Sequence, residues 1–353
     1  MKKSRTNILI ALISLVITLL AGEAVLRATG YCKTYSERRD GTYNDFSDYD
    51  HHNIWWRQYP NNDFKIETPE FTVVHHINSL GFSGGEFHQR TDSNEIRILT
   101  LGDSFTYGDG GTGDSSYPSV LQGLLNARFP GKKITVFNGG TCGSDPVFGF
   151  MAYTRLLQDT VNPDIIIQAF HDQDLREDFV IRKGFERYDN DSSMTFKGIK
   201  FRWKNLYHYS HLARLFFRNF LGYNEYYINN AIVRKSMPED VKTMKEVDAL
   251  WNDTLKPGQQ FFYLLHPDPI EIEKDKYETI FQTVLDSMAP GMGKLGVIDF
   301  RYWLVHQYHI KNDSIMSIYW PKDRHHNSKG YSLMALCVAD KLTPILNERF
   351  KDK

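Results

Sequence analysis

Cysteine is scarce in this chain of 353 residues, which has only Cys32, Cys142 and Cys337. None of the three stands in a CxxC or Cys/His spacing, so the sequence indicates neither a structural zinc site nor a disulfide framework. A single bridge in an oxidising compartment stays open as an alternative. The pairs His51-His52 and His75-His76 have no carboxylate or cysteine at ligand spacing. We therefore expect no metal and no cofactor.

An excess of basic charge is also lacking, because 42 Lys and Arg residues face 43 Asp and Glu residues and leave a formal net charge of -1. Phosphate recognition depends on a basic surface, so we expect no nucleic-acid partner. No internal repeat or low-complexity tract stands out. The apolar fraction of 41% is that of an ordinary globular protein. The length suffices for one large α/β domain with an insertion, or for two domains.

The amino-terminal segment carries an export signal. Lys2, Lys3 and Arg5 precede an uncharged apolar run over residues 8–22, which is the pattern of a basic region followed by a hydrophobic region. The run is shorter than the roughly 20 residues of a full span, although residues 24–26 extend it beyond Glu23. We expect an uncleaved single-pass anchor, with a cleaved signal peptide as the alternative. The basic residues predict a cytoplasmic amino terminus, with the bulk of the chain outside the cell membrane.

Short β-rich apolar runs alternate with helical patterns beyond residue 94. The five runs cover residues 96–101, 134–137, 164–170, 261–265 and 295–300. Such runs, separated by helices, predict a five-stranded parallel sheet that is covered on both faces.

Helix-start residues and changes in composition define the other segments that we expect in the chain. Ser116 and Pro118 begin a predicted helix, and Asn327 precedes another over residues 328–346. We expect a cytoplasmic tip and anchor at 1–26, a stalk and amino-terminal extension at 27–94, and the main domain at 95–353. Residues 181–258 are predicted to be an insertion or cap, with a charged helix around residues 241–251.

A serine stands where the first predicted strand ends, in Gly102-Asp103-Ser104. Ligands bind at the carboxyl ends of strands in an open parallel sheet, so Ser104 is placed to act as a nucleophile. The tripeptide resembles the first block of the SGNH (GDSL-type) hydrolase family. That resemblance implies a three-layer, flavodoxin-like fold. A turn serine that only caps a helix is the alternative.

A second block of this family matches near the carboxyl terminus. The family presents an aspartate and a histidine shortly before its final helix, and Asp323 and His325 fit the Asp-x-His spacing, with Asn327 and Gly330 in register. His326 is the alternative base under an Asp-x-x-His spacing. A serine needs a neutral imidazole to take its proton, and the imidazole needs a carboxylate to orient it.

The resemblance also implies donors for an oxyanion. Asn138 and Gly143 match the family's second block, in which the glycine N–H is a donor. The third block normally carries an asparagine, and Gln173 stands at that position here. We expect the N–H groups of Ser104 and Gly143 and the carboxamide of Gln173 to form an oxyanion hole. The departure at Gln173 is the feature that most favours a non-catalytic protein.

These resemblances imply an enzyme of the exported, membrane-anchored bacterial type, in which Asn78-Ser79-Leu80-Gly81-Phe82 also recurs. We expect a carboxylic ester hydrolase acting on O-acyl, chiefly O-acetyl, groups of envelope or exported polysaccharide, with an acylated carbohydrate and the membrane as partners. One alternative is an O-acyltransferase that uses the same triad. The other is a catalytically inactive carbohydrate-binding protein of the envelope.

Overall fold

The computed structural model describes residues 2–31, 58, 60–112, 114–172, 174, 185–187, 194–196, 206, 209–221, 237–288 and 295–351. The chain divides into two compact units. The first comprises residues 1–43 and 197–234, and the second comprises residues 44–196 and 235–353. The stretch over 181–258 is therefore shared between the two units. Gln173 lies outside the described residues.

The first unit contains two described helices, α1 (Lys2–Thr29) and α9 (His211–Leu221). Residues Thr6–Thr29 of α1 are long and apolar enough to span a membrane, and none of their most apolar window is buried. The sequence predicted this apolar helix, which runs on past Glu23 to Thr29. The two helices pack against each other.

The second unit is built on a five-stranded sheet in which every pairing is parallel. In spatial order its strands are β4 (Ile134–Gly140), β3 (Ile96–Gly102), β5 (Ile165–Phe170), β8 (Gln260–Leu265) and β9 (Leu295–Asp299). The five predicted runs are thus confirmed as strands. The order 2-1-3-4-5 is that of flavodoxin-like folds, whose switch point lies where the chain turns from one side of the first strand to the other.

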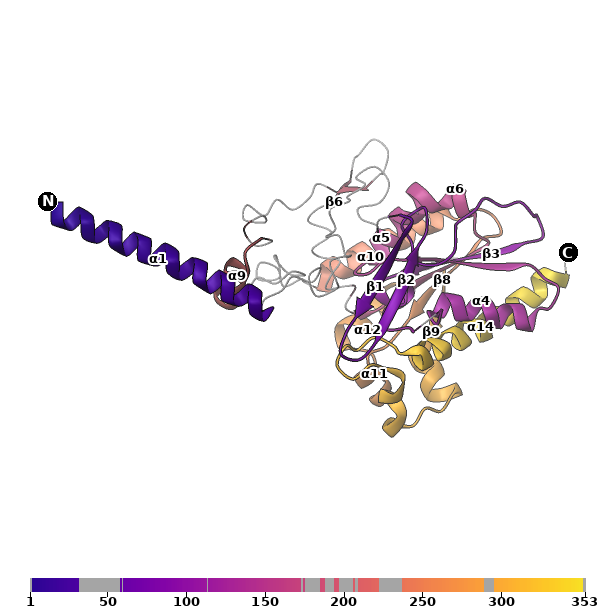
Figure 1. The fold of residues 1–353 in the computed structure, drawn as a ribbon. Coiled ribbons are helices and arrows are strands. Elements are labelled where there is room, and N and C mark those ends of the chain that lie inside the picture. The colour runs from indigo at the N-terminus through magenta and orange to yellow at the C-terminus, as the bar shows by residue number, and fades with distance from the viewer. Residues whose placement is uncertain are drawn as a thin grey trace. The chain divides into compact units, whose positions relative to one another are not determined.

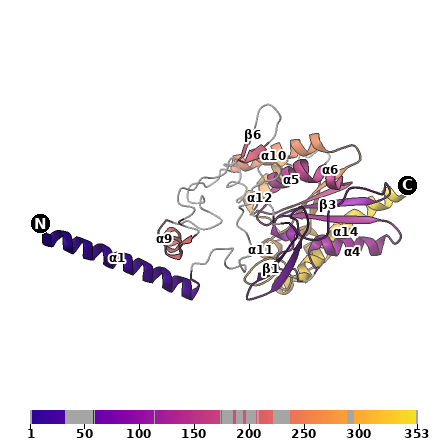
Figure 2. The same cartoon turned by 45° about the horizontal axis from the view of Figure 1, so that its top comes forward.

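Helices cover both faces of this sheet (Figures 1 and 2). Successive residues of a strand point to opposite faces, so each strand contributes to two apolar clusters. One cluster joins Ile98, Ile167 and Leu264 to α4 (Tyr117–Arg128) and α14 (Ser328–Lys351). The other joins neighbouring strand residues to α5 (Pro146–Ala152), α10 (Met237–Thr254) and α12 (Thr279–Met288). The three-layer α/β architecture predicted from the sequence is confirmed.

Both helices predicted from their first residues are present, but only one begins with a side-chain capping bond. Pro118 lies in the first turn of α4, and Ser116 occupies the position before it without a side-chain capping bond. The Asn327 side chain does cap α14, since its oxygen accepts from the N–H groups of Lys329 and Gly330 at 3.1 Å each. The remaining short helices are α3 (Ser104–Tyr107), α6 (Gln158–Val161), α11 (Pro269–Glu273) and α13 (Phe300–Tyr302).

Two antiparallel hairpins were not predicted from the sequence. The first pairs β1 (Asn62–Glu67) with β2 (Thr72–Ile77). The second pairs β6 (Phe185–Arg187) with β7 (Met194–Phe196). Residues of β2 alternate strictly between exposed and buried, which is the period-2 pattern of a half-buried strand. Part of the segment taken as a stalk and extension is therefore regular structure. Both described cysteines of the second unit, Cys142 and Cys337, are buried free thiols.

Candidate active site

Ser104 begins helix α3, two residues after the last residue of β3. Asp103 precedes it at the helix amino terminus, where its carboxylate accepts from the Phe105 N–H at 2.9 Å. Gly108 ends the helix in the left-handed conformation, with φ 101°. The short helix therefore holds Ser104 at the carboxyl edge of the sheet, which is where the sequence pattern placed it.

Two glycines allow α3 to approach the sheet. Gly102 has φ +145°, and a Cβ there would lie 2.4 Å from Thr106 Oγ1 and 2.7 Å from Ala169 Cβ. A Cβ on Gly140 would lie 2.3 Å from the Tyr107 backbone nitrogen. Neither position accepts a side chain without moving α3. The packing of α3 on β3 and β4 thus depends on these two glycines.

The structure brings Ser104, His325 and Asp323 together in a hydrogen-bonded chain. Ser104 Oγ lies 2.7 Å from His325 Nε2, and His325 Nδ1 lies 2.5 Å from Asp323 Oδ1. When Nδ1 carries the proton and donates a hydrogen bond to the carboxylate, Nε2 is free to accept a hydrogen bond from the serine O–H. This is the arrangement of a nucleophile, a base and an orienting acid. The histidine and the aspartate come from the loop before α14, more than 200 residues after the serine.

The loop that carries Asp323 and His325 is held from the β1–β2 hairpin. The Glu70 carboxylate accepts from the N–H of Lys322 at 3.0 Å and from the N–H of Asp323 at 2.8 Å. On the other side of the loop, the Trp320 indole donates to the Gly110 carbonyl at 2.8 Å. Sequence reasoning missed Glu70, because nothing in its local pattern links it to a loop 252 residues away.

The two adjacent histidines differ in environment. Burial alone would lower the pKa of His325, but the hydrogen bond to Asp323 and the charges of Asp109, Asp323 and Asp103 outweigh it and raise that pKa. His326 is fully buried, and its Nδ1 lies 3.2 Å from the Ile318 carbonyl rather than near Ser104. Burial lowers the pKa of His326 to about 3. His326 therefore stays neutral and packed, and His325 alone of the two reaches Ser104.

The predicted oxyanion donors can be placed in part. The turn after β4 is fixed to the nucleophile strand, because Thr141 N and Ser144 Oγ both donate to the Gly102 carbonyl, at 2.8 and 2.7 Å. Gly143 lies in this turn with φ 70°. The N–H groups of Ser104 and Gly143 have no acceptor among the described residues. Gln173, the third predicted donor, lies outside them, so its role stays a prediction.

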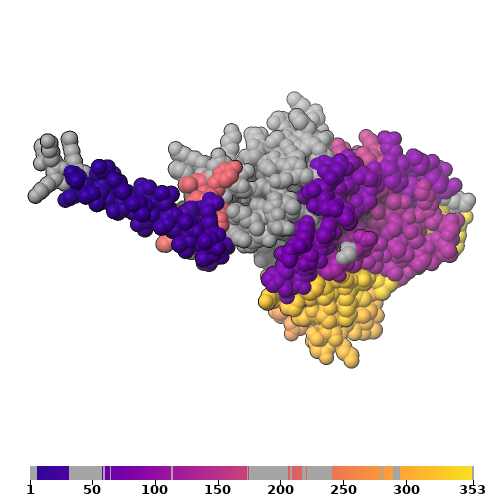
Figure 3. All heavy atoms as spheres, viewed as in Figure 1, coloured from indigo at the N-terminus to yellow at the C-terminus, as the bar shows by residue number. Residues whose placement is uncertain are grey.

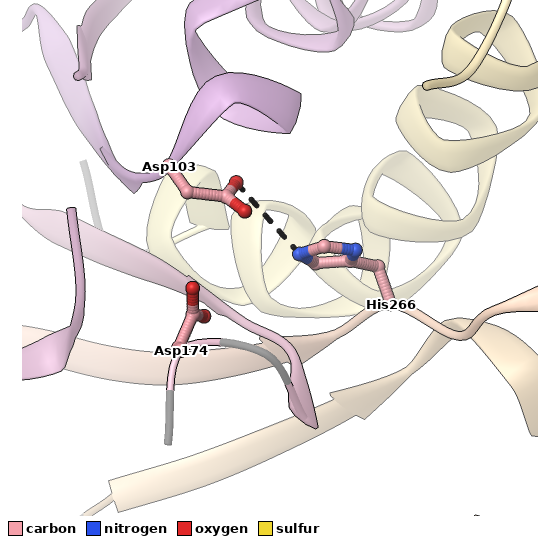
Figure 4. Close-up of side chains that lie close together, drawn as sticks. All are labelled: Asp103, Asp174 and His266. Atoms are coloured by element: carbon pink, nitrogen blue, oxygen red, sulfur yellow. Dashed lines mark ion pairs between the residues drawn. The ribbon is translucent and has the colours of Figure 1, made fainter. Parts of the chain in front are cut away.

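A buried polar cluster includes Asp103, the residue before the nucleophile in the chain (Figure 4). His266 Nε2 lies 3.9 Å from Asp103 Oδ1, and Asp174 faces the same space. Asp174 also accepts from the His171 N–H at 2.8 Å. Burial raises the pKa of Asp103, while the charge of His171 opposes that shift. Burial lowers the pKa of His266 well below 6.5, and the neighbouring histidines add to the effect.

His171 supplies the positive charge of this cluster. Burial would lower its pKa, but Asp268, Asp172 and Asp103 raise it to about 9. Its ring stacks on His266 at 4.7 Å between centroids. The sequence analysis did not single out His266 or Asp268, which belong to this cluster together with His171. All three follow strands β5 and β8, so a scan of strand ends would have found them.

Two groups of side chains in this region have donor atoms close enough together to hold a cation. They are Asp103 with Asp174 and His266, and His171 with Asp172 and Asp268. The His171 imidazolium already balances carboxylate charge in both groups, because it is coupled to Asp103, Asp172 and Asp268. No step of the chemistry proposed below depends on a metal.

No family model and no curated protein sequence matches the chain. Similar solved structures include a two-domain esterase (CEX) active on acetylated mannans, at 16% identity and a TM-score of 0.40, covering 70% of this chain. The chain spans about half of that esterase, 49% of its length.

Two further similar structures are matched over nearly their whole length. A family 3 carbohydrate esterase of Clostridium thermocellum is 16% identical with a TM-score of 0.42, and covers 72% of this chain and 98% of its own. A member of the lipolytic protein G-D-S-L family from Veillonella parvula is 14% identical with a TM-score of 0.40, and covers 70% and 98%. The Veillonella protein bears the G-D-S-L family name. That is the family whose blocks the sequence resembles. At such identities and TM-scores these likenesses carry no argument for this chain, and the chemistry must be inferred from the site itself.

Proposed function

We propose that this chain is a serine-dependent acyl-ester hydrolase of the SGNH type. The observation that carries the proposal is the continuous chain from Ser104 Oγ to His325 Nε2, at 2.7 Å, and from His325 Nδ1 to Asp323, at 2.5 Å. The distance from Ser104 to His325 lies within the hydrogen-bond reach expected of a nucleophile and its base. An envelope protein that only binds carbohydrate has no need of this geometry, so it argues against the non-catalytic alternative.

The proposed reaction proceeds through an acyl-enzyme. His325 takes the Ser104 proton as Oγ attacks the ester carbonyl, and the carbonyl oxygen becomes an oxyanion that accepts from the N–H groups of Ser104 and Gly143. The His325 imidazolium then protonates the leaving alkoxide, and the ester bond breaks. Water attacks the acyl-serine with His325 again as base, which releases the acid and restores the hydroxyl. Gln173 is the predicted third donor.

The proposed substrate is an O-acyl group, chiefly O-acetyl, on envelope or exported polysaccharide. This part of the proposal rests on the resemblance of the sequence blocks to exported members of the family. The location follows from α1, which we propose to be a single-pass anchor. Lys2, Lys3 and Arg5 precede its apolar run, so we place the second unit outside the cytoplasm.

Turnover of two substrates tests this function. Wild type should release acetate from an aryl acetate and from an acetylated oligosaccharide, whereas Ser104→Ala should lose several orders of magnitude in rate. Mass analysis of the products separates hydrolysis from transfer, because a transferase acetylates an added deacetylated sugar. Equal rates in wild type and Ser104→Ala, with both proteins folded, would rule out the proposed nucleophile.

A further inference from the structure

Glu23 is an unusual residue for its position in α1. A hydrocarbon core about 30 Å thick takes roughly 20 helical residues. Counted from Ile8, where the apolar run begins, such a span ends at Arg27. The Glu23 carboxylate then lies about one helical turn inside the apolar region. A charge at that depth is costly unless a partner compensates it.

Helix α9 supplies that partner. The Glu23 carboxylate accepts from Ser210 Oγ at 2.9 Å, from the Leu212 N–H at 2.8 Å and from the His211 N–H at 3.1 Å. These groups form the amino end of α9, where unpaired N–H groups and the helix dipole favour a negative charge. Arg27 adds a fourth bond to Glu23 at 2.6 Å. The amino end of α9 is therefore tied to α1 at the depth of the membrane boundary.

The burial pattern of α9 is the reverse of that in a water-soluble helix. Arg214 is 0% exposed and His211 is 4% exposed, whereas Phe216 is 52% and Phe220 is 75% exposed. The two phenylalanines are one turn apart, and their rings stack at 5.5 Å between centroids. A helix in water buries such rings and exposes its arginine. This side of α9 is suited to an apolar neighbour.

The composition around α9 indicates which neighbour that is. Residues 197–234, which belong to the same unit as α1, include seven Lys or Arg residues and ten aromatic residues but a single acidic residue, Glu225. Basic side chains pair with anionic lipid headgroups, and aromatic side chains concentrate at membrane interfaces. This local charge contrasts with the balanced charge of the whole chain. The basic charge of residues 197–234 complements an anionic lipid surface, rather than the surface of a protein with this chain's nearly zero net charge.

We propose that α9 lies in the plane of the membrane interface, with Phe216 and Phe220 inserted among the lipids and Glu23 fixing it to the anchor. Figure 3 shows the two helices in contact along the carboxyl-terminal part of α1. The proposal rests on α1 crossing the membrane, as proposed above. Amphipathic helices of this kind bury their apolar side at the boundary of headgroups and acyl chains. The anchor is thus a two-helix device rather than a single span.

Depth-dependent quenching in the full-length protein tests this arrangement. Phe220→Cys, made in a Cys32→Ser background and labelled with bimane, is placed in nanodiscs of phosphatidylcholine and phosphatidylglycerol. Cys142 and Cys337 are 2% and 3% exposed and do not compete for the label. We expect lipids carrying a nitroxide high on the acyl chain to quench the probe strongly, and aqueous iodide to quench it weakly.

Two control positions make every outcome decisive. Leu15→Cys in α1 reports the span itself, and Lys245→Cys on the exposed side of α10 reports a probe in water. If Leu15→Cys is quenched by lipid while Phe220→Cys follows Lys245→Cys, α9 is not in the interface and the proposal is overturned with the anchor intact. If Leu15→Cys is also quenched only by iodide, the span and the interfacial helix both fail, and the esterase proposal is unaffected.

Discussion

His325 and His326 are neighbours in the chain, but one lies in the site and the other in the buried interior. The side chain of His325 reaches the edge of the site between Ser104 and Asp323. His326 packs inside the second unit against the rings of Phe300 and Tyr319. Sequence spacing left both open as the base, because a shift of one residue changes which side chain faces the nucleophile.

Substitution of each histidine should therefore affect a different property. His325→Ala should lower kcat by several orders of magnitude with little change in stability, because it removes the base from a partly exposed position. His326→Ala should leave kcat of the folded protein near that of wild type but cost on the order of 3 kcal/mol, because it opens a cavity. Kinetics and thermal unfolding of both variants measure this. The reverse ranking of kcat would transfer the role of base to His326.

The pH dependence of the reaction follows from the raised pKa of His325. Only the neutral imidazole can take the serine proton, so kcat/KM should rise with pH through the pKa of His325. Because that pKa is raised above the ordinary 6.5, the midpoint of the acid limb should lie above pH 6.5. Asp323→Asn replaces the carboxylate with a neutral amide and so removes the charge that raises this pKa, and the midpoint should move down as the rate falls. An unchanged midpoint in Asp323→Asn would mean that another group controls the profile.

At the residue scale, the sequence was informative where spacing along the chain sets geometry. Ser104 at a strand end and Asp323 two residues before His325 could be recognised because their roles depend on local turns. Glu70 could not, because its contact is made with a segment that the fold brings to it from far along the chain. Such side chains have no short-range signature.

Among the elements, the contact between α3 and β4 is the most sensitive. A Cβ at Gly140 would lie 2.3 Å from Tyr107 N and 2.6 Å from the Thr106 carbonyl carbon, which are backbone atoms of α3. Gly140→Ala should therefore displace Ser104 from His325. We expect a loss of about a hundredfold in kcat and of about 1–3 kcal/mol in stability.

Gly123 in α4 provides the matched control for this substitution. A Cβ there meets nothing within 4 Å. Gly123→Ala should keep full activity and raise stability by about 0.5–1 kcal/mol, as expected for glycine in a helix interior. Activity assays and denaturant unfolding compare the two variants. Full activity in Gly140→Ala would show that α3 can shift without disturbing the site.

The elements themselves were predicted unevenly. Buried parallel strands read as continuous apolar runs bounded by turns, so all five could be found from the sequence. Strand β2 has one exposed face, and the richness of the β1–β2 hairpin in His, Asn and Asp resembled a linker. The tip of the hairpin provides Glu70, so the missed element is one that supports the site.

For the whole molecule, the account requires that α1 remain attached and that the second unit lie outside the cytoplasm. A reporter fused after Lys353 should be active only when exported, and the protein should stay in the membrane fraction after a high-salt wash. The apolar window of α1 has no buried residues, which is what the proposed membrane span requires. A soluble product that begins shortly after Gly22 would instead identify a cleaved signal peptide.

Chemical activation of Ser104 is the claim on which the esterase account depends most directly. A fluorophosphonate reacts with a serine only when a base has activated it, and intact-mass analysis counts the adducts. The account predicts one adduct on wild type, none on Ser104→Ala and a greatly slowed reaction for His325→Ala. Absence of labelling on folded wild type, or equal labelling of wild type and Ser104→Ala, would contradict it.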